Sequence, residues 1–279
     1  MLFYNLYHLQ NKYKYLTFAI RFKKMNDFWI YIFIGFFAQM IDGAFGMAYG
    51  VITTSLLLFF FPNFMSPAMA SAIMHFSEIF NTGYSSYVYK KNNLINKKMF
   101  FAMLYPAIFG AVIGSISISF FSKHYINYIK PFIAIYFIVV SVIIVFRAFR
   151  LFEKRKRWFS IPMLSAFGAF MDSVGGGGWG ALVTSALIAG GRNLRTTIGT
   201  VHAIKFIVVL CSSLTFLFLL PLSYLWTVVW VSMGSILAVP ISISINNKIP
   251  QKFGLLIVAI ILFLIAMKIS INSWFYFNH

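Results

Sequence analysis

The residues of this chain that are best able to do chemistry are acids, histidines and glycines that recur in the two halves of a strongly apolar sequence. A first motif, Asp42-Gly43-Ala44-Phe45-Gly46-Met47-Ala48-Tyr49-Gly50, matches a second motif, Asp172-Ser173-Val174-Gly175-Gly176-Gly177-Gly178-Trp179-Gly180. Both hold an acid, two glycines and an aromatic residue in one frame. A carboxylate inside an apolar run is unfavourable, and glycines weaken a helix. Because the sequence tolerates this penalty twice, the pattern indicates a transport pathway in a membrane protein.

A second duplicated feature pairs a histidine with a charged residue three positions later. His75 and Glu78 match His202 and Lys205 in register. Residues three apart share one face of a helix, so each pair faces the same way. Each histidine is either a structural hydrogen-bonding group or a substrate ligand. Lys205 either neutralises Glu78 or Asp172 in a salt bridge or supplies the counter-charge for an anion.

Three of the five acidic residues fall inside apolar runs, namely Asp42, Glu78 and Asp172. Intramembrane acids usually face a bundle interior or a water-filled path, and many of them relay protons. The alternative for Asp42 and Asp172 is capping, in which the carboxylate accepts backbone N–H bonds at the start of a half-helix. A helix start of this kind presents N–H groups and the positive end of the helix dipole, which suits a small oxyanion.

Composition places the chain in a lipid bilayer. Of 279 residues, 61% are hydrophobic and only 10% are charged. Most of the basic residues behind the net charge of +18 lie in short breaks between apolar runs, where they act as topology signals and contact anionic lipid headgroups, and no nucleic-acid-binding module is visible. The single cysteine, Cys211, allows neither a disulfide within the chain nor a cysteine cluster for a metal. We expect no metal and no cofactor.

The apolar segments predict an all-α polytopic membrane protein. The run 28–61 would be about 50 Å long as one helix, against a hydrocarbon core of about 30 Å, so it must break, and 42–50 is the place. The same reasoning puts a break at 172–180 within the run 159–190. We therefore expect eight to ten transmembrane segments in two internal repeats, each beginning with a broken or re-entrant helical hairpin whose exposed backbone lines a cavity. The segments are 28–41, 43–61, 67–89, 99–121, 131–149, 160–171, 177–190, 197–219, 223–245 and 254–275.

Basic loop residues orient these segments. Lysines and arginines cluster around 90–98, 147–157, 192–195 and 248–252, and the positive-inside rule places these loops in the cytoplasm. Five crossings in each half would satisfy this and imply inverted repeats. The basic amino terminus would then lie outside, so either residues 1–24 are not native and Met25 is the true start, or the first half makes four crossings. We divide the chain into an amino-terminal extension (1–24), a first transmembrane repeat (25–150), a basic cytoplasmic linker (151–158) and a second transmembrane repeat (159–279).

The four consecutive glycines of the second motif predict unwound backbone. Such a run disfavours a helix by roughly 4 kcal/mol relative to alanine. Spacing of the small-xxx-small type, in Gly46/Gly50 and Gly176/Gly180, would instead let two helices approach closely. No Lys-Ser/Thr follows the glycines, so a nucleotide-triphosphate loop is not indicated.

These segments resemble a known family. Ala38–Gly50, His75–Glu78 and Gly168–Gly180 are similar to the signature segments of the TauE/SafE sulfite exporter family, and the resemblance covers nearly the whole chain from Met25 onward. It implies a bacterial inner-membrane, multi-pass permease for sulfite, sulfonates or related sulfur compounds. Where the resemblance leads us to expect an acid after the second histidine, this chain has Lys205, which puts proton coupling at that position in doubt and makes anion binding easier.

We therefore expect a membrane transporter that exports sulfite or a related small anion by alternating access. The sequence leaves open whether this transport is coupled to protons. Glu78 or Asp172 would carry the proton, and Asp42, Glu78 and Asp172 are the candidate coupling or structural acids. The candidate substrate-binding residues are Gly43, Gly46, Tyr49, Gly50, His75, Gly175, Gly176, Gly177, Gly178, Trp179, Gly180, His202 and Lys205. The alternatives are an anion channel, a permease for sulfonates or other organic anions, an intramembrane enzyme or a membrane scaffold. No His-Glu-x-x-His or Gly-x-Ser-x-Gly string supports an enzyme or a set of catalytic residues. The sequence leaves the substrate, direction, coupling ion and oligomeric state open.

Overall fold

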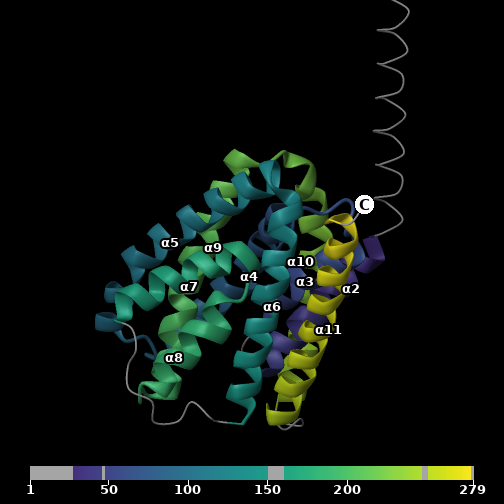
Figure 1. Ribbon diagram of the computed structural model, residues 1–279. Coiled ribbons are helices and arrows are strands. Elements are labelled where there is room, and N and C mark those ends of the chain that lie inside the picture. Colours follow the sequence, from purple (N-terminus) through teal and green to yellow (C-terminus); the bar gives the residue numbers. More distant parts are fainter. Residues whose placement is uncertain (1–27, 46–47, 150–159, 247–250, 278–279) are drawn as a thin grey trace, which may run out of the picture.

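The computed structural model describes residues 28–45, 48–149, 160–246 and 251–277, and within these ranges the chain is helical without any strand. Figure 1 shows the helices gathered into one bundle. The all-α prediction is therefore confirmed for the described part. The proposed extension 1–24, the linker 151–158 and Gly46 of the first motif lie outside the described residues.

Six long helices form most of the bundle. By length and hydropathy, five of the described helices could cross a membrane, all of the six except α4. Helix α4 is as long but carries His75, Glu78 and Lys90. The expectation of eight to ten segments stays a prediction. The long helices are α4 (Pro67–Lys91), α5 (Lys97–His124), α6 (Ile126–Ala148), α9 (Leu194–Leu219), α10 (Leu225–Asn246) and α11 (Gln251–Phe277).

Local sequence signals set where several of these helices begin. The Ser66 hydroxyl accepts the Met69 N–H ahead of α4, and Asn96 accepts the Met99 N–H ahead of α5. Asn193 caps α9 in the same way. Serine and asparagine are favoured at this position because their side-chain oxygens accept one of the N–H groups left free at a helix start. The starts of α4, α5 and α9 thus follow from single polar residues.

The two motifs break their helices as predicted. Helix α2 (Phe28–Phe45) ends within the first motif, and α3 (Tyr49–Phe60) starts after Ala48, whose φ is 87°. Helix α7 (Ile161–Gly175) ends within the second motif at Gly176, and the π-helix η1 (Gly178–Val183) then leads into α8 (Thr184–Ala189). Short π-helices often occur at functional sites, so this geometry directs attention to the breaks.

Helices far apart in the sequence pair with each other. Helix α2 packs on α10, whereas α7 packs on α5. Helix α4 packs on α9, and α6 runs beside α11, which Figure 1 shows as a teal and a yellow helix side by side. A 3-10 turn, η2 (Leu222–Tyr224), joins α9 to α10. Each broken hairpin is therefore held by a helix from the other half of the chain.

Tyr49 and Trp179, at matching positions of the two motifs, anchor two hydrophobic clusters. Both side chains are 0% exposed. Tyr49 packs in the cluster that contains Leu57 and Met74, and Trp179 packs in the cluster that contains Met103. Large aromatic residues on the outer face of α5 are exposed instead, which suits a surface in contact with lipid. The core therefore positions the motifs, and the apolar exterior fits a bilayer.

Candidate functional site

Each motif acid caps the half-helix that follows it. Asp42 Oδ1 accepts the backbone N–H of Tyr49 at 3.2 Å, and Asp172 Oδ1 accepts that of Trp179 at 3.3 Å. Both bonds span seven residues and close the break between two helix ends. The capping interpretation is thus observed for both acids, and it occupies one oxygen of each carboxylate.

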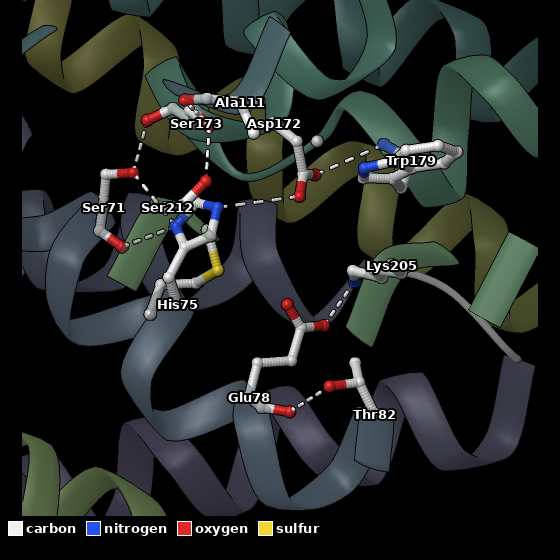
Figure 2. A network of polar contacts seen from close by, with 12 residues as sticks. Ser71, His75, Glu78, Thr82, Ala111, Asp172, Ser173, Trp179, Lys205 and Ser212 are labelled. Carbon is white, nitrogen blue, oxygen red and sulfur yellow. Dashed lines mark hydrogen bonds and ion pairs between the residues drawn. The ribbon is translucent and has the colours of Figure 1, made fainter. Parts of the chain in front are cut away.

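The second oxygen of Asp172 faces His75 across the two halves of the chain. His75 Nε2 lies 3.8 Å from Asp172 Oδ2, and both side chains are almost fully buried. The other ring nitrogen, Nδ1, lies 2.9 Å from the Ser71 carbonyl oxygen, which can only accept a hydrogen bond. Nδ1 therefore carries a proton, so Nε2 is the nitrogen that gains or loses one toward Asp172. Figure 2 shows this arrangement.

A buried ion pair joins α4 to α9 next to the histidine. Lys205 Nζ contacts Glu78 Oε1, and both residues are buried. This is one of the two partners that the sequence left open for Lys205. The second oxygen of Glu78, Oε2, has no hydrogen-bond partner among the described residues. The pair neutralises two buried charges while leaving one acceptor unused.

Unpartnered polar atoms gather around this pair. Within the described part of the chain, four buried side-chain atoms of the region lack a hydrogen bond: His75 Nε2, Glu78 Oε2, Asp172 Oδ2 and Trp179 Nε1. Figure 2 shows these four side chains arranged together with Lys205. Buried polar atoms in native proteins almost always have a partner. Such a cluster is therefore the place where a small polar ligand or a proton would complete the structure.

The two motifs touch through their glycine backbones. A Cβ at Gly50 would lie 2.1 Å from the Gly176 carbonyl oxygen, and Gly176 itself has φ +81°, which favours glycine. The Tyr136 hydroxyl accepts the Gly177 N–H at 3.0 Å, and a Cβ at Gly175 would meet the same ring at 2.3 Å. Close packing and unwound backbone, two interpretations of the glycines, thus apply together.

Comparison with known proteins identifies the family. The model of the family described as "Sulfite exporter TauE/SafE" matches residues 31–269. The chain belongs to the TauE/SafE family. It is 32% identical over 263 residues to the protein named "Probable membrane transporter protein YtnM" of Bacillus subtilis (strain 168), covering 90% of this chain and 85% of that relative. No solved structure matches the chain. Together with the apolar helices, these relationships make it a multi-pass membrane transporter.

Of the site residues predicted for this TauE/SafE transporter, the structure brings five side chains together: His75, Glu78, Asp172, Trp179 and Lys205. Each comes from a segment that the sequence had marked by duplication. They lie on α4, α7, η1 and α9, so the site is built from both halves of the chain.

Other predicted residues lie apart from this cluster or serve as packing groups. The His202 ring lies tilted against the Tyr89 ring, with ring centroids 5.4 Å apart. The Tyr49 hydroxyl donates to Ser77 Oγ at 2.8 Å. A Cβ at Gly43 would lie 2.1 Å from the Ser242 hydroxyl of α10, so this glycine permits the α2–α10 contact. In the second motif, Gly178 packs directly against α7, because a Cβ at this position would lie 1.8 Å from the Gly168 carbonyl oxygen.

Sequence reasoning missed a serine network that supports the histidine. Ser71 Oγ donates to the Ser173 carbonyl, while Ser173 Oγ and Ser212 Oγ are 2.8 Å apart. These bonds tie α4, α7 and α9 together behind the imidazole. Ser71 lies one helical turn before His75, which is the spacing that could have marked it.

Sequence reasoning also treated Arg147 as a topology signal only. Its Nη1 donates to the Gly180 carbonyl at 3.1 Å and to Ser185 Oγ at 3.3 Å. This arginine therefore links α6 to the π-helix η1 and to α8. Nothing in the local sequence of α6 distinguishes it from the basic residues that follow it.

Proposed function

We propose that this transporter moves sulfite or a related small sulfur oxyanion across the bacterial inner membrane by alternating access, in the export direction, and that proton movement is coupled to it. The observation that carries the proposal is the cluster of unpartnered buried polar atoms beside the Glu78–Lys205 pair. The name of the family, Sulfite exporter TauE/SafE, supports the choice of sulfur oxyanion.

The donors needed for an oxyanion lie in this cluster. The Trp179 indole N–H has no acceptor among the described residues, and the Lys205 ammonium has three N–H groups, of which one meets Glu78. A protonated His75 would present a further N–H toward Asp172. An oxyanion accepts several hydrogen bonds through its oxygens, so three converging donors suit it.

Charge balance supports proton coupling. Lys205 is balanced by Glu78, and Asp172 adds a further negative charge unless His75 is protonated. Both members of the ion pair also interact electrostatically with Asp42 and Asp172. An anion entering a site with this excess negative charge is repelled, because like charges repel strongly in a low-dielectric interior. Uptake of a proton by Asp172 or His75 removes this excess charge, and uptake by Glu78 frees Lys205 for the anion.

The proposed architecture is a pair of inverted repeats, 25–150 and 159–279, joined by a basic cytoplasmic linker at 151–158. The reciprocal packing of α2 on α10 and of α7 on α5 supports it, because each broken hairpin packs on the corresponding helix of the other half. The six long helices cross the membrane, and the two hairpins enter from opposite sides. Counting each hairpin as one or two segments gives the expected eight to ten. Lys90, Lys91, Arg192 and Arg195 then face the cytoplasm.

The test is sulfite flux in proteoliposomes that contain the purified protein, with and without an imposed pH gradient. Asp172→Asn is the informative variant, because the asparagine oxygen still accepts the Trp179 N–H while the negative charge toward His75 is lost. Asp42→Asn is the matched variant for the other motif, where the Tyr49 cap is likewise kept.

Saturable, gradient-sensitive sulfite movement that is lost in Asp172→Asn supports the proposal. Normal transport by both variants at equal expression would make the acids purely structural and would overturn the coupling. Flux that does not saturate would favour an anion channel. Movement of sulfonates without movement of sulfite would favour an organic-anion permease.

A further inference from the structure

Helices α4 and α9 cross in a nearly symmetrical way. Glu78 and Lys205, which meet at the crossing, are 127 positions apart. The same shift along the chain relates His75 to His202. It also relates the two ring contacts on either side of the ion pair, which are His75–Phe216 at 5.8 Å and Tyr89–His202 at 5.4 Å. The ion pair therefore lies at the centre of an internal twofold relationship, with one histidine on each side.

The capping acids are related in the same way, with a shift along the chain that is three positions longer. Asp42 binds the N–H of Tyr49 and Asp172 binds that of Trp179, at 3.2 and 3.3 Å. Asp172 Oδ2 lies 3.8 Å from His75 Nε2 of the opposite half, and the twofold relationship makes Asp42 and His202 the equivalent pair. Each half thus contributes a histidine that the symmetry pairs with the capping acid of the other half.

The two His–Asp pairs differ in how tightly they are closed. His75 and Asp172 are 3.8 Å apart and almost fully buried, and Ser71 fixes the imidazole. Among the described residues, His202 and Asp42 do not form an ion pair within 4.0 Å, and both are half-buried. His202 Nδ1, although buried, has no hydrogen-bond partner in the described part. One pair is in contact, and the equivalent pair is not.

We infer that Asp42 and His202 form a second half-site for the same small oxyanion, equivalent to Asp172 and His75, and that it closes when the His75–Asp172 half-site opens. The inference rests on the proposed alternating access, because it assigns the two states to two specific residue pairs. Glu78 and Lys205 remain at the crossing in both states, where either half-site can present the anion to Lys205.

The side that is open follows from the positions of the pairs along the helices. His75 and Phe216 lie toward the Pro67 end of α4 and the Leu219 end of α9. Tyr89 and His202 lie toward Lys91 and Leu194, the ends that carry Lys90 and Arg195. With these basic ends in the cytoplasm, the pair in contact lies toward the outside and the separated pair lies toward the inside. That is the state in which an exporter would load its anion.

Disulfide trapping tests the inference directly, because both His–Asp pairs join the two halves of the chain. The native Cys211 is first replaced by Ser, and a protease site is placed in the linker 151–158. Cysteine pairs are introduced at 75/172 and at 42/202, the membranes are oxidised, and the linker is cleaved. A disulfide then holds the halves together on a non-reducing gel. The control pair is Tyr105→Cys with Phe263→Cys, two exposed positions on α5 and α11.

Both His–Asp positions should cross-link above the control pair. The oxidation is done without sulfite, because sulfite itself cleaves disulfide bonds. A protein with all four cysteines should form one disulfide per molecule at a time. Cross-linking at 75/172 with none at 42/202 under any condition, or both disulfides together in one molecule, would overturn the inference.

A double-mutant cycle provides a second measurement that needs no cysteines. Asp42→Asn and His202→Gln are compared with the double variant for sulfite flux, in samples shown to be folded by gel filtration. If the residues act as a pair, the double variant is no slower than the slower single variant, whereas independent roles give multiplied losses. Wild-type flux tests the proposed function separately, since absent flux with correct trapping would change only the substrate.

Discussion

The contact between the two glycine backbones can be measured with a single methyl group. Gly176→Ala would place a Cβ 2.5 Å from the Gly50 carbonyl carbon, and it would also force alanine into φ +81°. Gly191→Ala is a matched control, because Gly191 has φ +79° and follows the end of a helix, but no atom lies within 4 Å of its Cβ position. Both variants carry the same backbone strain, about 1–2 kcal/mol. Only the first variant meets a backbone neighbour.

The difference between the two variants isolates the motif contact. Overpacking a tight site costs about 1–3 kcal/mol, and each kcal/mol lowers the melting midpoint by about 2–4 °C in a protein of this size. Gly176→Ala should therefore melt about 2–12 °C below Gly191→Ala in detergent, measured by intrinsic tryptophan fluorescence. Equal midpoints for the two variants would refute the reasoning, because the added methyl group would then be accommodated between the motifs at no cost in stability.

Four further substitutions have expected outcomes. Glu78→Gln or Lys205→Met alone should destabilise the protein by about 3–5 kcal/mol, because each leaves a buried charge unpaired. The double variant should recover most of this loss. Thermal melts of the three proteins check this, and additive losses would contradict it. Tyr136→Phe removes the acceptor of the Gly177 N–H, so the melt should show a loss of about 1–3 kcal/mol, and an unchanged midpoint would place water there instead. Arg147→Lys keeps the charge but loses the guanidinium geometry that bonds the second motif; sulfite flux should fall in this variant, and wild-type flux would show that the contact is dispensable.

Several features of the fold and site could be predicted because they have local physical causes. A carboxylate and glycines inside an apolar run locate a helix break, and both breaks lie where Asp42 and Asp172 predict them. The caps themselves follow from the same residues. Lys205 in an apolar run needs a counter-charge, and Glu78 was one of the two candidates.

Other features depend on which helices meet and have no local signal. Alignment places His75 with His202 and Asp42 with Asp172, but it does not say that His75 faces the acid of the other half. The contact of Arg147 with the second motif also has no local signal, because it forms only where α6 lies beside η1. Long-range packing, rather than the periodicity or composition of any one segment, decides both contacts.

Each broken hairpin packs on a helix of the other half of the chain, and this has a consequence for how the protein is synthesised. Helix α7 packs on α5, which has already been synthesised when α7 emerges, but α2 packs on α10, near the end of the chain. The first hairpin must therefore wait in the bilayer until almost all of the polypeptide has been inserted. Contacts between segments so distant in sequence form slowly, and the exposed intermediates are prone to misassembly. Biogenesis should thus be most vulnerable at the last two helices, where truncation would leave the first hairpin without its partner.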